Sequence, residues 1–116
     1  MSALAQKRPL ETDAAIVVLG GSFCPLHAGH LAALEAGRTQ AQALGLTVVA
    51  GYLACAHDSH VRAKLGAEST AAEERWLAGS MRLAMCNAAS AAVDWLRPTP
   101  KTFGSARECA EAMVAA

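Results

Sequence analysis

The stretch that decides the fold is Ala14-Ala15-Ile16-Val17-Val18-Leu19-Gly20-Gly21, a continuous apolar run that ends in two glycines. Its length and its β-branched centre are typical of a strand that is buried on both faces, as in a parallel sheet. The two glycines allow the chain to turn directly after it. The sequence therefore predicts a buried strand over residues 14–19, followed by a tight turn.

Helical and strand-like segments alternate after this turn. Residues 28–44 are strong helix formers, and Leu31, Leu34 and Ala41 fall on one side of the expected helix. Residues 46–53 are rich in apolar and β-branched side chains and predict a second strand. This strand, helix and strand together indicate one unit of a parallel sheet with its crossover helix.

The middle of the chain predicts a loop, a helix and a short strand. Residues 55–67 show no clear period, which favours a loop. Thr70-Ala71-Ala72-Glu73 has the spacing of a capping box and is expected to open a helix that ends near Ala89. Residues 91–96 are a candidate for a third strand. The inner face of the helix is expected to carry Leu77, Met81, Ala84 and Ala88.

A final helix is expected beyond the chain-breaking Pro98 and Pro100, because Ser105-Ala106-Arg107-Glu108 is a second candidate capping box. The resulting β-α-β-α-β-α order predicts an α/β fold with a Rossmann-like parallel sheet and helices on its faces. Residues 1–13 are polar and are expected to form a flexible tail before a single domain at 14–116. Ligands of such sheets bind at the carboxyl ends of the strands.

The composition narrows the classes of function. The 116 residues suffice for one small domain, and the net charge of zero argues against a nucleic-acid or anionic-membrane partner. The sequence has neither a signal peptide nor an apolar run of the ~18 residues that cross a bilayer, so we expect a soluble protein of the cytoplasm or nucleus. Its four cysteines form no C-x-x-C pair and are expected to be reduced. Three of them, Cys55, Cys86 and Cys109, are expected to fill the core.

The segment from Gly20 to His30 lies where the first strand gives way to its helix. Gly20 and Gly21 let the backbone turn and let a ligand approach, and the N–H groups of the turn that contains Gly20, Gly21 and Ser22 can point at an anion. The start of the following helix adds unpaired donors and a positive dipole end. This segment matches neither the dinucleotide fingerprint nor the P-loop, yet its chemistry predicts a phosphate site.

Two histidines strengthen this interpretation. His27 and His30 are three residues apart at a helix start, so their side chains can lie on one face. Imidazoles beside a phosphate can donate hydrogen bonds that strengthen as negative charge builds in a transition state. Gly29 is expected to leave open the space through which a nucleotide approaches.

Gly21-Ser22-Phe23-x-Pro25-x-His27-x-Gly29-His30 resembles the signature of the HxGH nucleotidyltransferases. Within this superfamily the chain is most similar to the nicotinamide/nicotinate mononucleotide adenylyltransferases, which tend to have Gly-Ser-Phe or Gly-Thr-Phe at this point. A weaker similarity continues through Asp58, Arg62 and Lys64 and through Glu74-Arg75-Trp76, so that the resemblance covers roughly residues 14–97. Pantetheine-phosphate adenylyltransferases and cytidylyltransferases share the HxGH element, which leaves the acceptor nucleotide open.

The resemblance implies adenylyl transfer from ATP to a pyridine mononucleotide such as NMN, with release of pyrophosphate, in NAD biosynthesis. The 5′-phosphate of the mononucleotide would attack the α-phosphorus of ATP in line, without a covalent enzyme intermediate. Mg²⁺ would arrive with ATP, and no residue is assigned as a metal ligand of the protein itself.

The same resemblance implies roles for individual residues. His27 and His30 would hold the ATP phosphates, while the backbone of residues 21–23 would contact the mononucleotide and the reacting phosphate. Lys64 would bind a phosphate as a point charge. Trp95 is a candidate for stacking on the pyridine ring.

The chain departs from the family pattern in two ways. Cys24 stands where the family often has Asp or Asn. The family also has a second signature, a Ser/Thr-rich turn that opens a helix with an Arg, and residues 102–107 resemble it only faintly and in a different topological place. The expected fold is therefore the front half of a nucleotidyltransferase, and a homo-oligomer is one way to cover the open edge of its sheet.

Two alternatives belong to other classes of function. One is a non-catalytic nucleotide-binding module that keeps the front phosphate site but does not hold pyrophosphate as a leaving group. The other is a metal-binding protein, because Cys24-x-x-His27-x-x-His30 and Cys55-x-His57-x-x-His60 contain metal-ligating residue types at short spacings.

Overall fold

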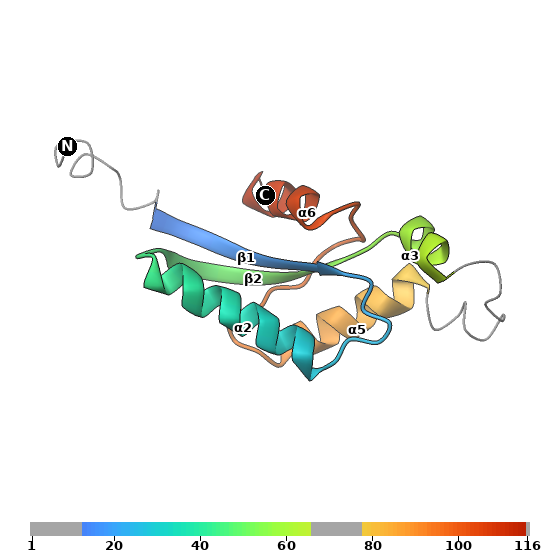
Figure 1. Ribbon diagram of the computed structural model, residues 1–116, viewed down its shortest axis with the longest axis horizontal. Helices are drawn as coiled ribbons and strands as arrows, with labels where there is room; N and C mark the ends of the chain where they lie inside the picture. Colours follow the sequence, from blue (N-terminus) through green and yellow to red (C-terminus); the bar gives the residue numbers. More distant parts are fainter. Residues whose placement is uncertain (1–12, 66–77, 116) are drawn as a thin grey trace.

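The computed structural model describes residues 13–65 and 78–115, with no account of the side chains of residues 64 and 65. Most of the predicted N-terminal tail and the capping box at residues 70–73 lie outside these ranges. The elements follow one another as β1 (Ala14–Gly21), α2 (Ala28–Ala43), β2 (Thr47–Cys55), α3 (Asp58–Leu65), α5 (Gly79–Ala91) and α6 (Ala106–Ala115), and Figure 1 shows their arrangement. The fold is α/β, as predicted.

The sheet consists, within the described ranges, of β1 and β2 in parallel. Their register runs from Ala14 opposite Thr47 to Gly21 opposite Cys55, with one irregularity between Ala15 and Ile16. Both strands therefore end at the same edge of the sheet. The residues that follow Gly21 and Cys55 start from adjacent points in space.

Helices cover both faces of this sheet (Figure 1). Side chains alternate along each strand, so that Leu19 and Leu53 join the cluster beneath α2 and α5, while Val18 and Ala54 join the cluster beneath α6. Leu34 of α2 is buried, and Leu31 packs against the same cluster, as the periodicity predicts. The three cysteines expected in the core, Cys55, Cys86 and Cys109, are fully buried.

The predicted third strand at residues 91–96 is wrong. Ala91 is the last residue of α5, and from this stretch Leu96 alone forms a bridge with β2, opposite Gly51. A second isolated bridge joins Ala56 to Phe103. Pro98 and Pro100 lie between the two bridges and lack the N–H groups of a continuous ladder, so residues 96–103 follow the edge of β2 without forming a strand.

The helix predicted from Thr70 to about Ala89 also differs from α5. The described helix begins at Gly79 because Ala78 has an extended backbone (φ −58°, ψ 137°), and it ends at Ala91. Its inner face carries Gly79, Arg82, Cys86 and Ser90, whereas Met81, Ala84 and Ala88 are exposed. The predicted stripe was wrong at these three positions, and its fourth member, Leu77, lies outside the described residues. An arginine occupies the buried face, and hydrophobic periodicity does not locate a buried charge.

The stretch predicted as a loop at residues 55–67 contains helix α3. Among its described side chains, Val61 is buried at 2% exposure, so a single apolar anchor holds the helix and leaves no periodic pattern in the sequence.

The capping prediction for α6 holds in part. Ser105 Oγ accepts from Glu108 N (3.1 Å), but the Glu108 carboxylate accepts from Gly104 N (3.1 Å) and not from the N-cap itself. Across the described residues, every helix is too short or too polar to cross a lipid bilayer.

Candidate functional site

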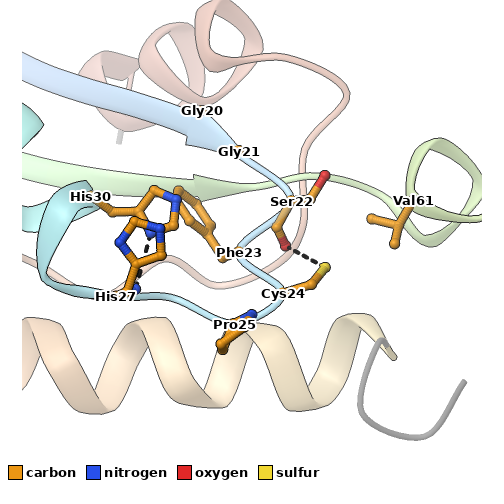
Figure 2. Close-up of a pocket in the computed structure, with 9 residues that line it drawn as sticks. All are labelled: Gly20, Gly21, Ser22, Phe23, Cys24, Pro25, His27, His30 and Val61. Atoms are coloured by element: carbon orange, nitrogen blue, oxygen red, sulfur yellow. Dashed lines mark hydrogen bonds between the residues drawn. The ribbon is translucent and has the colours of Figure 1, made fainter. Parts of the chain in front are cut away.

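The segment from Gly20 to His30 lies at the carboxyl end of β1 and borders a cavity of about 400 Å³. Figure 2 shows the residues around this cavity, which come from the end of β1, the loop that follows, the first turn of α2 and helix α3. They are Gly20, Gly21, Ser22, Phe23, Cys24, Pro25, His27, His30 and Val61. Seven of the predicted site residues, from Gly20 to Phe23 with His27, Gly29 and His30, thus belong to one continuous segment that runs from the end of β1 through the loop to the first turn of α2.

Phe23 fixes the shape of this loop. Its backbone has φ of +52°, a left-handed conformation that costs a bulky residue about 1–3 kcal/mol. The ring is 2% exposed and meets the ring of His30 edge-on, with centroids 5.0 Å apart. Burial of the ring in the core beneath α2 offsets the strained backbone, and the loop is held in one shape.

The two histidines cap helix α2 and also each other. His27 is the N-cap, and its Nδ1 accepts from Gly29 N (3.1 Å), while His30 Nδ1 accepts from His27 N (3.0 Å). A nitrogen that accepts a hydrogen bond carries no proton, so a neutral ring in this arrangement has its proton on Nε2. The capping bonds therefore leave two Nε2–H donors on rings whose centroids are 3.9 Å apart.

The environment favours the neutral form of His30. Burial, with a smaller contribution from the neighbouring His27, lowers the pKa of His30 below its usual value. The Nε2–H tautomer is then the main form near neutral pH. Such a ring donates a hydrogen bond to an anion without carrying a full charge of its own.

Gly29 has a more specific role than the one inferred from the sequence. A Cβ atom at this position would lie 2.8 Å from Cε1 of His27, closer than real side-chain contacts allow. Glycine is therefore required here by the capping position of the His27 ring. Space for the ring, and not space for a ligand, is what the structure shows at this residue.

Arg82 is a residue of this region that sequence reasoning missed. Its side chain is fully buried, and its guanidinium donates to the carbonyl oxygens of Ser22 (3.0 Å) and Ala56 (2.8 Å) and to Asp58 Oδ1 (2.9 Å). The signal was present in the sequence. Gly79, Cys86 and Ser90, at helical spacing around Arg82, are small and leave room for a long side chain on that face.

A second cavity, of about 380 Å³, lies on the other side of the end of β1. It shares Gly20, Gly21 and Ser22 with the first cavity and is also bordered by Ala54, Ala56, His60, Phe103, Gly104, Ser105 and Ala106. The start of α6 approaches so closely that a Cβ at Gly20 would lie 3.0 Å from Cβ of Ala106. From the sequence, residues 102–107 were expected in a different topological position from the first motif. In the structure, residues 103–106 are neighbours of that motif.

Two predicted site residues, Trp95 and Lys64, are not among the described residues that line the first cavity. Trp95 donates from Nε1 to Glu35 Oε2 (3.0 Å) and lies under the guanidinium of Arg38 (4.9 Å), beside the outer part of α2. It lines a separate cavity of about 280 Å³, so the structure gives no support for stacking on a ligand at the strand ends. Lys64 lies in α3, and its side chain is outside the described atoms.

The alternative of a metal site gains no support from the geometry. Within residues 13–65 and 78–115, no three His, Cys, Asp or Glu side chains are grouped so that they could hold an ion. Cys24 Sγ is directed at the carbonyl oxygen of Ser22 (3.5 Å), and Cys55 lies in the core beside Arg82. The two short His/Cys spacings therefore do not converge.

Comparison of the chain with models of protein families, with curated proteins and with solved structures finds no match. A function is therefore inferred from the residues from Gly20 to His30, their spacing and their geometry.

Proposed function

We propose that the protein is a nucleotidyltransferase of the HxGH type, with a partial Rossmann-like fold, that transfers the adenylyl group of ATP to a pyridine mononucleotide such as NMN. The observation that carries this proposal is the pair of Nε2–H donors, which capping bonds direct away from the backbone beside the end of β1. Two such donors next to a helix N-terminus suit the oxygens of a phosphate chain.

In the proposed reaction a 5′-phosphate oxygen of the mononucleotide forms a bond to the α-phosphorus of ATP. The bond from that phosphorus to the bridging oxygen breaks, and pyrophosphate leaves with the electron pair. Charge on the transferring group grows during this step, and the Nε2–H groups of His27 and His30 stabilise it. Mg²⁺ would enter on the phosphates of ATP.

The two cavities offer room for two reactants at the end of β1. The backbone of Gly20 to Ser22 is a wall that both cavities share. In our proposal the cavity beside His27 and His30 takes the triphosphate, and the cavity beside the start of α6 takes the acceptor. Both reactants would then contact the backbone of Gly20 to Ser22, and in-line displacement requires that they meet at one α-phosphorus beyond the end of β1.

A second candidate is a nucleotide-binding module without turnover. Neither cavity has a lysine or arginine among its described lining residues. Cations normally compensate the charge of a departing pyrophosphate, so a site without them would bind a nucleotide more readily than it would transfer one.

The purified protein, incubated with MgATP and NMN or nicotinate mononucleotide, separates these candidates. We expect release of pyrophosphate in step with formation of the dinucleotide, and calorimetry should show saturable binding of MgATP. Binding without pyrophosphate release would select the module. Absence of MgATP binding by the wild-type protein would contradict both.

A further inference from the structure

The buried guanidinium of Arg82 joins the ends of both strands to helix α3. It donates to the carbonyl oxygen of Ser22 after β1, to Sγ of Cys55 (3.3 Å) and the carbonyl oxygen of Ala56 at the end of β2, and to the carboxylate of Asp58. Three separate segments thus converge on one planar group. A planar fork of fixed donors holds its acceptors in a defined geometry, which a flexible ammonium does not.

Stability alone does not explain an arginine at this position. Burying a charge carries a desolvation cost, and an apolar side chain of similar volume is often as stabilising as a buried ion pair. The partner carboxylate of Asp58 also remains 47% exposed, and the nearby water weakens the Coulomb attraction between the two charges. What the guanidinium contributes in addition is the direction of the carbonyl groups that it binds.

The direction of the Ser22 carbonyl has a consequence for the adjacent amide. The peptide bond between Ser22 and Phe23 is trans, and in a trans peptide the C=O and N–H bonds point in opposite directions. Since the carbonyl oxygen of Ser22 is turned to Arg82, the N–H of Phe23 is turned away from it. Phe23 and Ser22 both border the cavity beside the histidines.

We propose that Arg82 is a positioning residue that fixes the Ser22–Phe23 peptide, so that the Phe23 N–H is presented to a phosphate of the bound nucleotide. This inference rests on the proposed function, because it requires that the loop binds a nucleotide. Arg82 itself touches neither reactant and acts through the backbone. The positive φ of Phe23 fits this role, since an otherwise unfavourable backbone conformation must be held by its surroundings.

The test uses two substitutions and a matched control. Arg82→Lys keeps the charge but cannot span the same acceptors, and Arg82→Met fills the space without any donor. Arg97→Met is the control, because Arg97 also donates to backbone carbonyls, those of Asp94 and Leu96, but away from the loop. We expect kcat to fall about 10²-fold in Arg82→Met and by less in Arg82→Lys, a size typical of a small misplacement of groups at the reacting centre. The KM for the mononucleotide should stay within about threefold of wild type, and Arg97→Met should match wild type in both constants.

An NMR titration with MgATP tests the same inference without turnover. In the ¹⁵N-labelled wild-type protein the amide signal of Phe23 should shift as MgATP saturates the protein, and this shift should be lost in Arg82→Lys. Failure of the wild-type protein to bind MgATP would overturn the proposed function and this inference together. Binding with no shift at Phe23 would overturn the inference alone, even if neither variant folds. Equal kcat values in folded wild-type and Arg82 variants would also overturn it.

Discussion

At the scale of single residues, His27 and His30 each perform two tasks with the two nitrogens of one ring. Nδ1 accepts a backbone N–H at the start of α2, and this bond determines that Nε2 is the donor. The two tasks are separable, because side-chain amides can replace one nitrogen at a time. An Asn amide oxygen reaches about as far as Nδ1, and a Gln amide nitrogen about as far as Nε2.

His30→Asn should keep the helix cap and lose the phosphate donor. We expect an unchanged far-UV circular dichroism spectrum and a fall in kcat on the order of 10²–10³, the usual cost of one transition-state donor. His30→Gln should show the reverse balance, with more residual activity and a loss of about 1 kcal/mol in the free energy of unfolding from the cap. Activity near the wild-type level in His30→Asn would show that Nε2 has no role in transfer.

The lowered pKa of His30 predicts a dependence of stability on pH. A folded-state pKa below the unfolded value means that the unfolded chain binds more protons in the window between the two. The contribution of His30 is complete above its ordinary value of 6.5 and is lost as the pH falls through the lower, folded-state pKa. The Tm should therefore decrease between about pH 7 and pH 5, and His30→Asn should reduce that slope. An unchanged slope in the variant would contradict the assignment.

At the scale of elements, the chain from α5 to α6 is held beside β2 by backbone bonds at two isolated bridges and, between them, by a side chain of α5. The amide of Asn87 donates to the carbonyl oxygen of Thr99 and accepts from its N–H, both at 3.0 Å. This pairing lies between the two isolated bridges at Leu96 and Phe103. It keeps the start of α6, and with it the second cavity, next to the end of β1.

Asn87→Ala should consequently destabilise the fold although it removes little apolar surface. Thr99 is buried at 3% exposure, so its backbone groups would be left unpaired. We expect a loss of about 1–3 kcal/mol in the free energy of unfolding by urea. Gln42→Ala, an amide-to-alanine change on the exposed side of α2, is the control and should stay within about 0.5 kcal/mol.

Helix α2 and the loop before it were predictable from the sequence, whereas the buried face of helix α5 was not. Glycines after an apolar run and the pair of histidines at a helix start carry local signals, and α2 buries the Leu34 face that its period indicates. The face of α5 depends on Arg82, whose acceptors come from Ser22, Ala56 and Asp58. These contacts join residues far apart in sequence, so the small residues around Arg82 indicate room for its side chain but not the groups that it binds.

At the scale of the whole molecule, the apolar run of β1 was expected to form a strand that is buried on both faces. In the structure its residues from Ala15 to Leu19 are half-buried, while Leu53, Ala54 and Cys55 of β2 are buried. The pattern of β1 correctly indicates apolar neighbours on both faces, provided by α2 and α6. It says nothing about how many strands lie beside it, because strand neighbours contact the backbone edges and not the side-chain faces.

The pairing of the two cavities also depends on the whole molecule, and the sequence alone did not predict it. Residues 103–106 approach Gly20 because α6 returns across the sheet on the face opposite α2, as Figure 1 shows. The family resemblance is strong only in the motif from Gly21 to His30, and this motif borders mainly the first cavity at the end of β1. The second cavity depends on the path of a chain that leaves β2, passes through α5 and returns.

The most direct test of the central claim is a crystal structure of the protein with a non-hydrolysable ATP analogue. The claim predicts that Nε2 of His27 and Nε2 of His30 each lie about 3 Å from phosphate oxygens, with both Nδ1 capping bonds kept. A triphosphate bound elsewhere, or either imidazole turned so that Nδ1 faces the phosphate, would contradict it.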